Sequence, residues 1–124
     1  MEKKSVLVVD DEEDVVRILR KQLVSAGYEA LIAYNGQQAI EKANEHPDLI
    51  LLDIMMPGMD GIEVLRQIRN NSETKETPVI MVTAKGASTS ILNAQELGVV
   101  DYIIKPFELK ELLALIKKYI IQYP

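Results

Sequence analysis

The chain contains no cysteine, only one histidine and no excess of positive charge. Without cysteine, disulfide bonds, thiolate nucleophiles and cysteine-ligated metal sites are excluded, and the composition fits a reducing compartment. The 19 acidic residues outnumber the 14 basic ones and give a net charge of −5. Because binding to nucleic-acid phosphates needs a basic stripe, we expect no direct nucleic-acid role.

Long apolar segments are also missing. No run approaches the ~18 apolar residues of a membrane span. The first apolar stretch stops at Asp10, which makes it too short for a signal peptide. The proportions of 48% hydrophobic and 27% charged residues are those of an ordinary globular protein. We therefore expect a single cytoplasmic domain over residues 1–124, without a membrane segment.

The single histidine, His46, lies directly before Pro47. A phosphohistidine carrier needs an exposed histidine on a helix of a bundle, whereas this pair is typical of a turn. We predict that His46 is a loop residue without a catalytic role.

Short apolar runs recur along the chain and are bounded by polar or turn residues. Such runs predict buried strands, here at Ser5–Val9, Leu49–Leu52, Val79–Val82 and Tyr102–Ile104, with a shorter strand at about Glu29–Ala33. Segments with apolar residues at helical spacing separate the strands. Five strands and five helices in strict alternation predict an α/β fold with a doubly wound parallel sheet.

Capping residues predict where several helices begin. Asn35 followed by Gln38, and Asp60 followed by Glu63, each have the spacing of a capping box at a helix start. A weaker helix is predicted at about Ser90–Leu97, and the last helix runs from Glu108 to about Ile121.

Four of the strands end on residues that can handle a phosphoryl group. Asp10 and Asp11 follow the first strand, and Asp53 follows the third. Thr83 and Lys105 follow the fourth and fifth. Because the carboxyl ends of parallel strands lie at one edge of the sheet, we expect these side chains to gather into one site.

Clustered carboxylates suit a hard divalent cation such as Mg²⁺, which prefers oxygen ligands and relieves their mutual repulsion. Asp53 precedes a loop and is not needed as a helix cap, so it is the candidate nucleophile toward phosphorus, forming an acyl phosphate. Glu12, Glu13 and Asp14 are interpreted as an acidic first helical turn.

The order of these motifs resembles the receiver domain of bacterial two-component response regulators, of the chemotaxis-regulator-like kind, from about Lys4 to Tyr119. Each motif alone is weak, but all of them in order are specific: Val8–Asp11, Leu51–Gly61, Val82–Ala84 and Asp101–Phe107. The resemblance implies a flavodoxin-like (βα)5 fold with strand order 2-1-3-4-5.

The resemblance also implies roles for site residues. Asp53 would accept a phosphoryl group from a phosphohistidine on a histidine kinase or histidine phosphotransferase. The Mg²⁺ ligands would be Asp10, Asp11, the Asp53 side chain and the Met55 backbone carbonyl. Phosphoryl oxygens would be contacted by Thr83, Ala84 and Lys105, and the Lys105–Pro106 peptide bond is expected to be cis.

Phosphorylation is expected to draw Thr83 and Lys105 inward and, by the resemblance, to rotate Tyr102 inward. The face formed by the fourth helix, fifth strand and fifth helix would then contact a downstream protein or effector domain. Met55 and Lys85 occupy positions that tune water access to the acyl phosphate in the family. The protein would be phosphorylated and dephosphorylated without turning over an external substrate.

Several alternatives stay open at this stage. A phosphatase of the haloacid-dehalogenase type also uses an aspartate nucleophile with Mg²⁺, but its nucleophile and acid/base are two residues apart, unlike the adjacent pair Asp10-Asp11. The glycines form no Walker A loop and no GxGxxG turn, which disfavours a nucleotide- or flavin-binding module. Within the receiver interpretation, the chain is a stand-alone regulator, a phosphorelay intermediate or the receiver of a larger protein.

Overall fold

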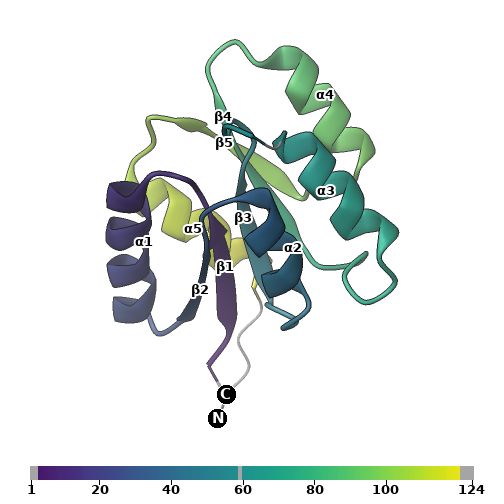
Figure 1. Cartoon of the computed structure of the whole chain (residues 1–124). Helices are drawn as coiled ribbons and strands as arrows, with labels where there is room; N and C mark the ends of the chain where they lie inside the picture. The colour runs from purple at the N-terminus through teal and green to yellow at the C-terminus, as the bar shows by residue number, and fades with distance from the viewer. Residues whose placement is uncertain (1–2, 59, 121–124) are drawn as a thin grey trace.

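The computed structural model describes residues 3–58 and 60–120, in which a five-stranded parallel sheet is flanked by helices (Figure 1). The strands are β1 Ser5–Val9, β2 Glu29–Ala33, β3 Leu49–Asp53, β4 Val79–Ala84 and β5 Asp101–Lys105. The helices are α1 Glu13–Ser25, α2 Gly36–Ala43, α3 Gly61–Asn70, α4 Ser88–Glu96 and α5 Leu109–Tyr119. The strand order is β2-β1-β3-β4-β5, which confirms the predicted flavodoxin-like α/β fold.

Two apolar layers cover the two faces of the sheet, because successive strand residues point to opposite sides. One layer joins α2, α3 and α4 to strand residues such as Leu7, Ile50 and Met81. The other joins α1 and α5 to the alternate positions, such as Val6 and Ile80. Figure 1 shows the same division, with α1 and α5 on one side of the sheet and α2, α3 and α4 on the other.

The helix starts differ in detail from the predicted capping boxes. Asn35 caps α2 by accepting from the Gln38 backbone N–H at 2.9 Å, but the Gln38 side chain accepts from the N–H of Tyr34 and not from that of Asn35. Asp60 caps α3 through the N–H of Ile62 at 2.8 Å. Its predicted partner Glu63 instead pairs with Arg66 one turn along the helix.

The predicted boundaries of the last elements shift by one or two residues. Helix α4 spans Ser88–Glu96, and β5 includes Asp101 and Lys105. Glu108 is the N-cap of α5 rather than its first residue, and Ile120 is the C-cap. Ile121, the expected helix end, and Met59 lie outside the described residues.

The topology predicts which edge of the sheet binds a ligand. From β1 the chain crosses to β2 on one side and then returns to β3 on the other, so the strand order reverses between β1 and β3. Ligands of such sheets bind beyond the strand carboxyl ends at this point. Asp10 and Asp53 lie at these strand ends. Among the described residues, no helix has the length and apolar character to cross a membrane.

Candidate functional site

Two buried carboxylates form the base of the site. Asp10 directly follows β1 and is 3% exposed, whereas Asp53 ends β3 and is 4% exposed. Each carboxylate accepts a local backbone hydrogen bond through Oδ1: Asp10 from the Glu12 N–H and Asp53 from the Met55 N–H, both at 2.9 Å. These turns fix both side chains and leave each Oδ2 for other partners.

Lys105 connects the two carboxylates. Its Nζ lies 2.9 Å from Asp10 Oδ2 and 3.0 Å from Asp53 Oδ2. A third acid, Glu12, approaches the same ammonium with Oε1 at 3.4 Å. Because Lys105 ends β5, one side chain joins residues that are 95 and 52 positions away in the chain.

Burial and charge act on the pKa values of this site in opposite directions. Burial raises the pKa of Asp53, and this outweighs the hydrogen bonds from Met55 and Lys105 that lower it. Burial lowers the pKa of Lys105, but the hydrogen bonds to Asp10 and Asp53 raise it by a larger amount, so the pKa lies above its ordinary value. Lys105 therefore carries its positive charge at neutral pH.

Thr83 adds a hydroxyl group without a partner. It lies in β4, where the preceding residue Val82 is paired with Asp53 across the sheet. Thr83 is buried, at 1% exposed, and Oγ1 finds no hydrogen-bond partner among the residues that the structure describes. Since an unsatisfied buried polar group costs about 1–3 kcal/mol, a hydrogen-bond acceptor brought to this atom would relieve that cost.

The carboxylates also provide a donor set for a cation. Ligand oxygens of Asp10, Asp11 and Glu12 lie within 4.8 Å of one another. These are the hard oxygen donors that Mg²⁺ prefers, so the residues fit the ion. The expected ligand Asp53 lies outside this group of three, with its Oδ2 hydrogen-bonded to Lys105.

Glu12 is a site residue that the sequence interpretation assigned only to an acidic helix turn. In the structure Glu12 is the N-cap of α1 but makes no side-chain capping bond, and its carboxylate faces Lys105. Its position directly after Asp10-Asp11 was the available signal. Sequence alone does not separate a third site acid from an ordinary acid at a helix start.

The other predicted site residues surround this centre. Met55 contributes its N–H to Asp53, and its side chain is 61% exposed. Ala84 ends β4 beside Lys105, and the Lys105–Pro106 peptide bond is cis, as expected. Tyr102 is 39% exposed and lines a surface cleft between β5 and α5, together with Lys85 and Leu115.

His46 lies away from these residues. It is exposed, has a φ of 58° and follows α2 in the turn before β3. This position confirms the prediction that His46 is a loop residue.

A sequence model described as the response regulator receiver domain matches residues 6–117. The chain belongs to this receiver domain family. The transcriptional regulatory protein ResD of Bacillus subtilis is 50% identical over 113 residues, which cover 90% of this chain and 46% of ResD. The uncharacterized transcriptional regulatory protein YkoG of the same organism is 42% identical over 118 residues, which cover 94% of this chain and 51% of YkoG. The receiver chain thus spans about half the length of these curated relatives.

Solved structures of receiver proteins share the fold. Chemotaxis protein CheY4 of Vibrio cholerae is 30% identical with a TM-score of 0.89, covering 96% of this chain and 100% of CheY4. The receiver domain of sensor histidine kinase PA1611 from Pseudomonas aeruginosa is 28% identical with a TM-score of 0.84. That match covers 95% of this chain and 98% of the PA1611 domain, whose structure has a magnesium ion coordinated in the active site cleft.

Proposed function

We propose that this receiver domain accepts a phosphoryl group on Asp53 from a phosphohistidine of a partner protein. The observation that carries the proposal is the Lys105 ammonium, which lies 3.0 Å from Oδ2 of the buried Asp53 carboxylate. Thr83 lies on the neighbouring strand β4, one residue past the partner of Asp53, and is the proposed second donor. A cation beside a buried carboxylate matches the needs of phosphoryl transfer, which are alignment and charge neutralisation.

In the transfer step, Asp53 Oδ2 attacks the phosphorus of the phosphohistidine. A P–O bond forms, the P–N bond breaks, and the imidazole leaves with that electron pair. Asp53 Oδ1 stays hydrogen-bonded to the Met55 N–H, so the carboxylate keeps its orientation. Thr83 Oγ1 and Lys105 then donate to the phosphoryl oxygens, which gives the buried hydroxyl its partner.

The cation site next to Asp53 supports the same role. Asp10 and Asp11 would hold Mg²⁺, with Asp53 and the Met55 backbone carbonyl as further ligands and Glu12 within reach. The ion would neutralise negative charge on the phosphoryl oxygens. Lys105 offsets only one of the two buried carboxylate charges, which leaves the site attractive for a cation.

Labelling with acetyl phosphate tests the proposal. We expect one phosphoryl group per wild-type chain in the presence of Mg²⁺, none in Asp53→Asn, and strongly reduced labelling in Asp11→Asn. Glu13→Gln is the matched control, because Glu13 is an exposed acid in the first turn of α1. Labelling of Asp53→Asn at the wild-type level would contradict the proposal. Repeated turnover of a small phosphomonoester would favour the phosphatase instead.

The donor protein would dock on an apolar groove beside the site. The groove has a volume of about 480 Å³ and is lined by Val15, Ile18 and Leu19 of α1, by Pro106, Phe107 and Leu109, and by Glu12 and Lys105 of the site. Lys105 both binds Asp53 and lines this groove, so a protein whose phosphohistidine reaches Asp53 would lie against the groove. Ile18, which is 49% exposed, is placed to contact a helix of the donor.

A variant that slows transfer from a protein donor, but not labelling by a small molecule, tests whether the donor docks on this groove. Ile18→Asp should slow phosphoryl transfer from a phosphorylated histidine kinase or histidine phosphotransferase at least tenfold, while labelling by acetyl phosphate is unchanged. Val24→Asp provides the control, because Val24 is equally exposed on α1 but does not line the groove. Equal transfer rates in both variants would exclude the groove as the docking site.

We infer that output passes through the face formed by α4, β5 and α5, with Tyr102 as the residue that changes position. Exposed apolar side chains on β5, Tyr102 and Ile104, support a contact role for this face. Because the chain spans about half of its regulator relatives, the target is either an effector domain or a separate protein. A Leu115→Asp, Tyr119→Ala variant with unchanged partner binding would contradict this assignment.

The phosphoryl group would be lost by hydrolysis or passed to another histidine, so no external substrate is turned over. Met55 and Lys85, both exposed near the site, are expected to set access of water to the acyl phosphate. Substituting both should change the hydrolysis rate of labelled protein. Transfer of label from Asp53 to a histidine phosphotransferase would identify a phosphorelay intermediate.

A further inference from the structure

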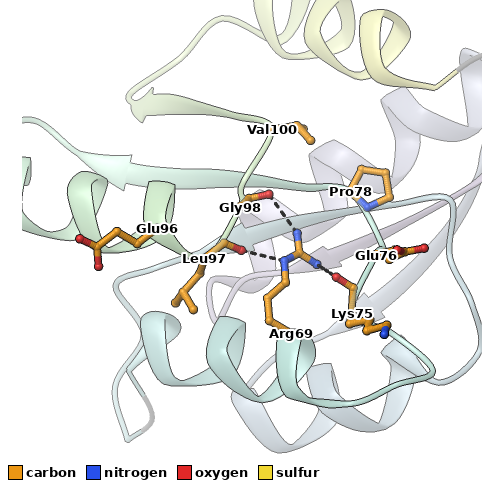
Figure 2. A pocket seen from close by; sticks show the side chains of 8 residues that line it. All are labelled: Arg69, Lys75, Glu76, Pro78, Glu96, Leu97, Gly98 and Val100. Atoms are coloured by element: carbon orange, nitrogen blue, oxygen red, sulfur yellow. Dashed lines mark hydrogen bonds between the residues drawn. The ribbon is translucent and has the colours of Figure 1, made fainter.

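Arg69, in the last turn of α3, donates hydrogen bonds to four backbone carbonyl oxygens outside its own helix. Nε donates to Leu97 O at 2.7 Å, and Nη2 donates to Gly98 O at 3.2 Å. Nη1 donates to Lys75 O at 3.1 Å and to Thr77 O at 2.8 Å. Figure 2 shows the guanidinium between these segments, at the side of a cleft also lined by Glu76, Pro78, Glu96 and Val100.

The four acceptors belong to two different segments. Leu97 is the C-cap of α4 and Gly98 follows it, so Arg69 binds the end of α4, where carbonyl groups lack helical partners and a cation is favourable. Lys75 and Thr77 belong to the connection between α3 and β4. One side chain therefore joins the end of α4 to the start of β4.

Helix α4 has few other attachments to the body of the protein. Ala94 is its only buried residue among those described, and the amino half contributes only the partly buried Ile91 to the apolar layer. The N-cap residue Ala87 makes no side-chain capping bond. Close to the Arg69 bonds, the N–H of Val100 donates to Val79 O at 2.9 Å, which adds a second fixed point after the helix. The carboxyl end of α4 is thus held by more contacts than the amino end.

The amino end of α4 adjoins the candidate phosphoryl site. Thr83 and Ala84 end β4, and Ala87 is joined to Ala84 by a backbone hydrogen bond of 3.3 Å. Movement of Thr83 toward a phosphoryl group would therefore reach the amino end of α4 within a few residues.

We propose that Arg69 is a positioning residue that fixes the carboxyl end of α4, so that a change at Thr83 moves only the amino-terminal half of the helix. We call the four hydrogen bonds of Arg69 the clamp. The evidence for the clamp is these contacts alone, whereas its use in signalling rests on the proposed function. The Arg69 contacts would hold the carboxyl end of α4, and with it that part of the output face, in place, while Arg69 itself lies on α3, outside the face.

Hydrogen exchange of backbone amides tests the clamp without any ligand. In Arg69→Gln, amides of residues 93–98 should exchange at least about tenfold faster relative to those of β3, because bonds to a charged group are lost. Arg66→Gln is the matched control, since Arg66 lies one turn earlier on α3 and, among the described residues, pairs with Glu63 alone. Arg69→Lys, which keeps the charge but loses the fork of donors, should fall between the two. Unchanged exchange at residues 93–98, or a uniform increase across all strands, would overturn the proposal.

Beryllium trifluoride with Mg²⁺ tests the use of the clamp, because it is a stable mimic of a phosphoryl group. In the wild type, bound mimic should change exchange at residues 86–91 and leave residues 93–98 unchanged. In Arg69→Gln, the change should extend through residues 93–98. Equal changes in both halves of the wild-type helix would overturn the one-sided movement. Failure of the mimic to bind would count against the proposed function, while the ligand-free comparison still decides on the clamp.

Discussion

At the scale of single residues, the charges of the site depend on one shared ammonium group, that of Lys105, and on burial. Its ammonium serves Asp10 and Asp53 together, so neither buried carboxylate has a cation of its own. Burial of Asp53 outweighs these contacts and raises its pKa. The unfolded chain therefore holds the charge of Asp53 at lower free energy than the folded protein does, and the site is less stable than a neutral one.

Asp53→Asn should consequently stabilise the protein at pH 7, by more than the ~0.5 kcal/mol scatter of surface substitutions. Between the unfolded pKa of 3.8 and the raised folded value, the native state binds more protons, so wild-type stability rises as pH falls through this window. The advantage of Asp53→Asn should therefore shrink toward pH 4. Urea unfolding at pH 7, 5 and 4 measures it.

The control for this prediction is Asp14→Asn. Asp14 pairs with Arg17 at the surface, where the two side chains are 83% and 75% exposed, so its removal should change stability little at any of these pH values. A lower unfolding midpoint for Asp53→Asn at pH 7 would mean that the Lys105 contact outweighs burial.

At the scale of elements, close packing of α3 against the end of β3 shapes the backbone around Asp53 and Ile54. A Cβ on Gly61 would clash with Ile54 Cα and would lie 2.9 Å from the Asp53 carbonyl oxygen, so only glycine fits without movement of the backbone. The Gly61 N–H also donates to Ile54 O at 3.1 Å. The helix start therefore fixes the backbone that carries Asp53.

Gly61→Ala should destabilise the protein by about 1–3 kcal/mol, the usual range for overpacking, and should slow acetyl phosphate labelling of Asp53. The labelling rate is expected to fall because Asp53 and Ile54 must shift. Ile62→Val is the comparison, since it alters the same helix turn by removing a methylene and should reduce stability while labelling stays normal. Denaturant unfolding and labelling rates, measured on both variants, separate the two effects.

Capping of α2 gives a second prediction at this scale. Asn35→Ala should lower stability by about 1 kcal/mol, because the Gln38 N–H loses its acceptor. Gln37→Ala serves as the control, since the Gln37 side chain bonds to Glu41 alone within the described part of the chain, on the exposed helix surface. The stability of this variant should stay within about 0.5 kcal/mol of the wild type. Similar values for the two variants in urea unfolding would argue against a capping role.

At the scale of the whole molecule, the fold and the centre of the site follow from local patterns. Apolar runs and helical spacing predicted the alternating elements, and the parallel sheet then placed Asp10, Asp53 and Lys105 at one edge, where the structure has them. The parts that sequence did not predict depend on backbone groups or loop geometry. Arg69 binds backbone carbonyl groups, which every residue possesses, so no sequence motif marks its partners. Glu12 differs from the neighbouring acids Glu13 and Asp14 because its side chain points toward Lys105, which the sequence does not reveal.

Cation binding should stabilise the molecule as a whole, because the ligand oxygens meet only in the folded state. At a Mg²⁺ concentration ten times the Kd, the gain is about 1.4 kcal/mol. The urea midpoint of the wild type should rise with Mg²⁺ and return after chelation with EDTA. In Asp11→Asn the rise should be mostly lost, whereas Glu13→Gln should respond like the wild type. An equal response in Asp11→Asn would place the ion elsewhere.

The unpaired hydroxyl of Thr83 affects how often the unmodified protein adopts an alternative conformation. A deficit of about 1–3 kcal/mol in one conformation corresponds to roughly a 5- to 150-fold preference for any alternative that supplies a partner. Other contacts favour the conformation in this structure, but this cost reduces the free-energy difference between it and a conformation in which the Thr83 hydroxyl has a partner. Under the proposed function, the same threonine would act on both states, because its missing partner favours the active conformation before phosphorylation and the phosphoryl group would supply that partner afterwards.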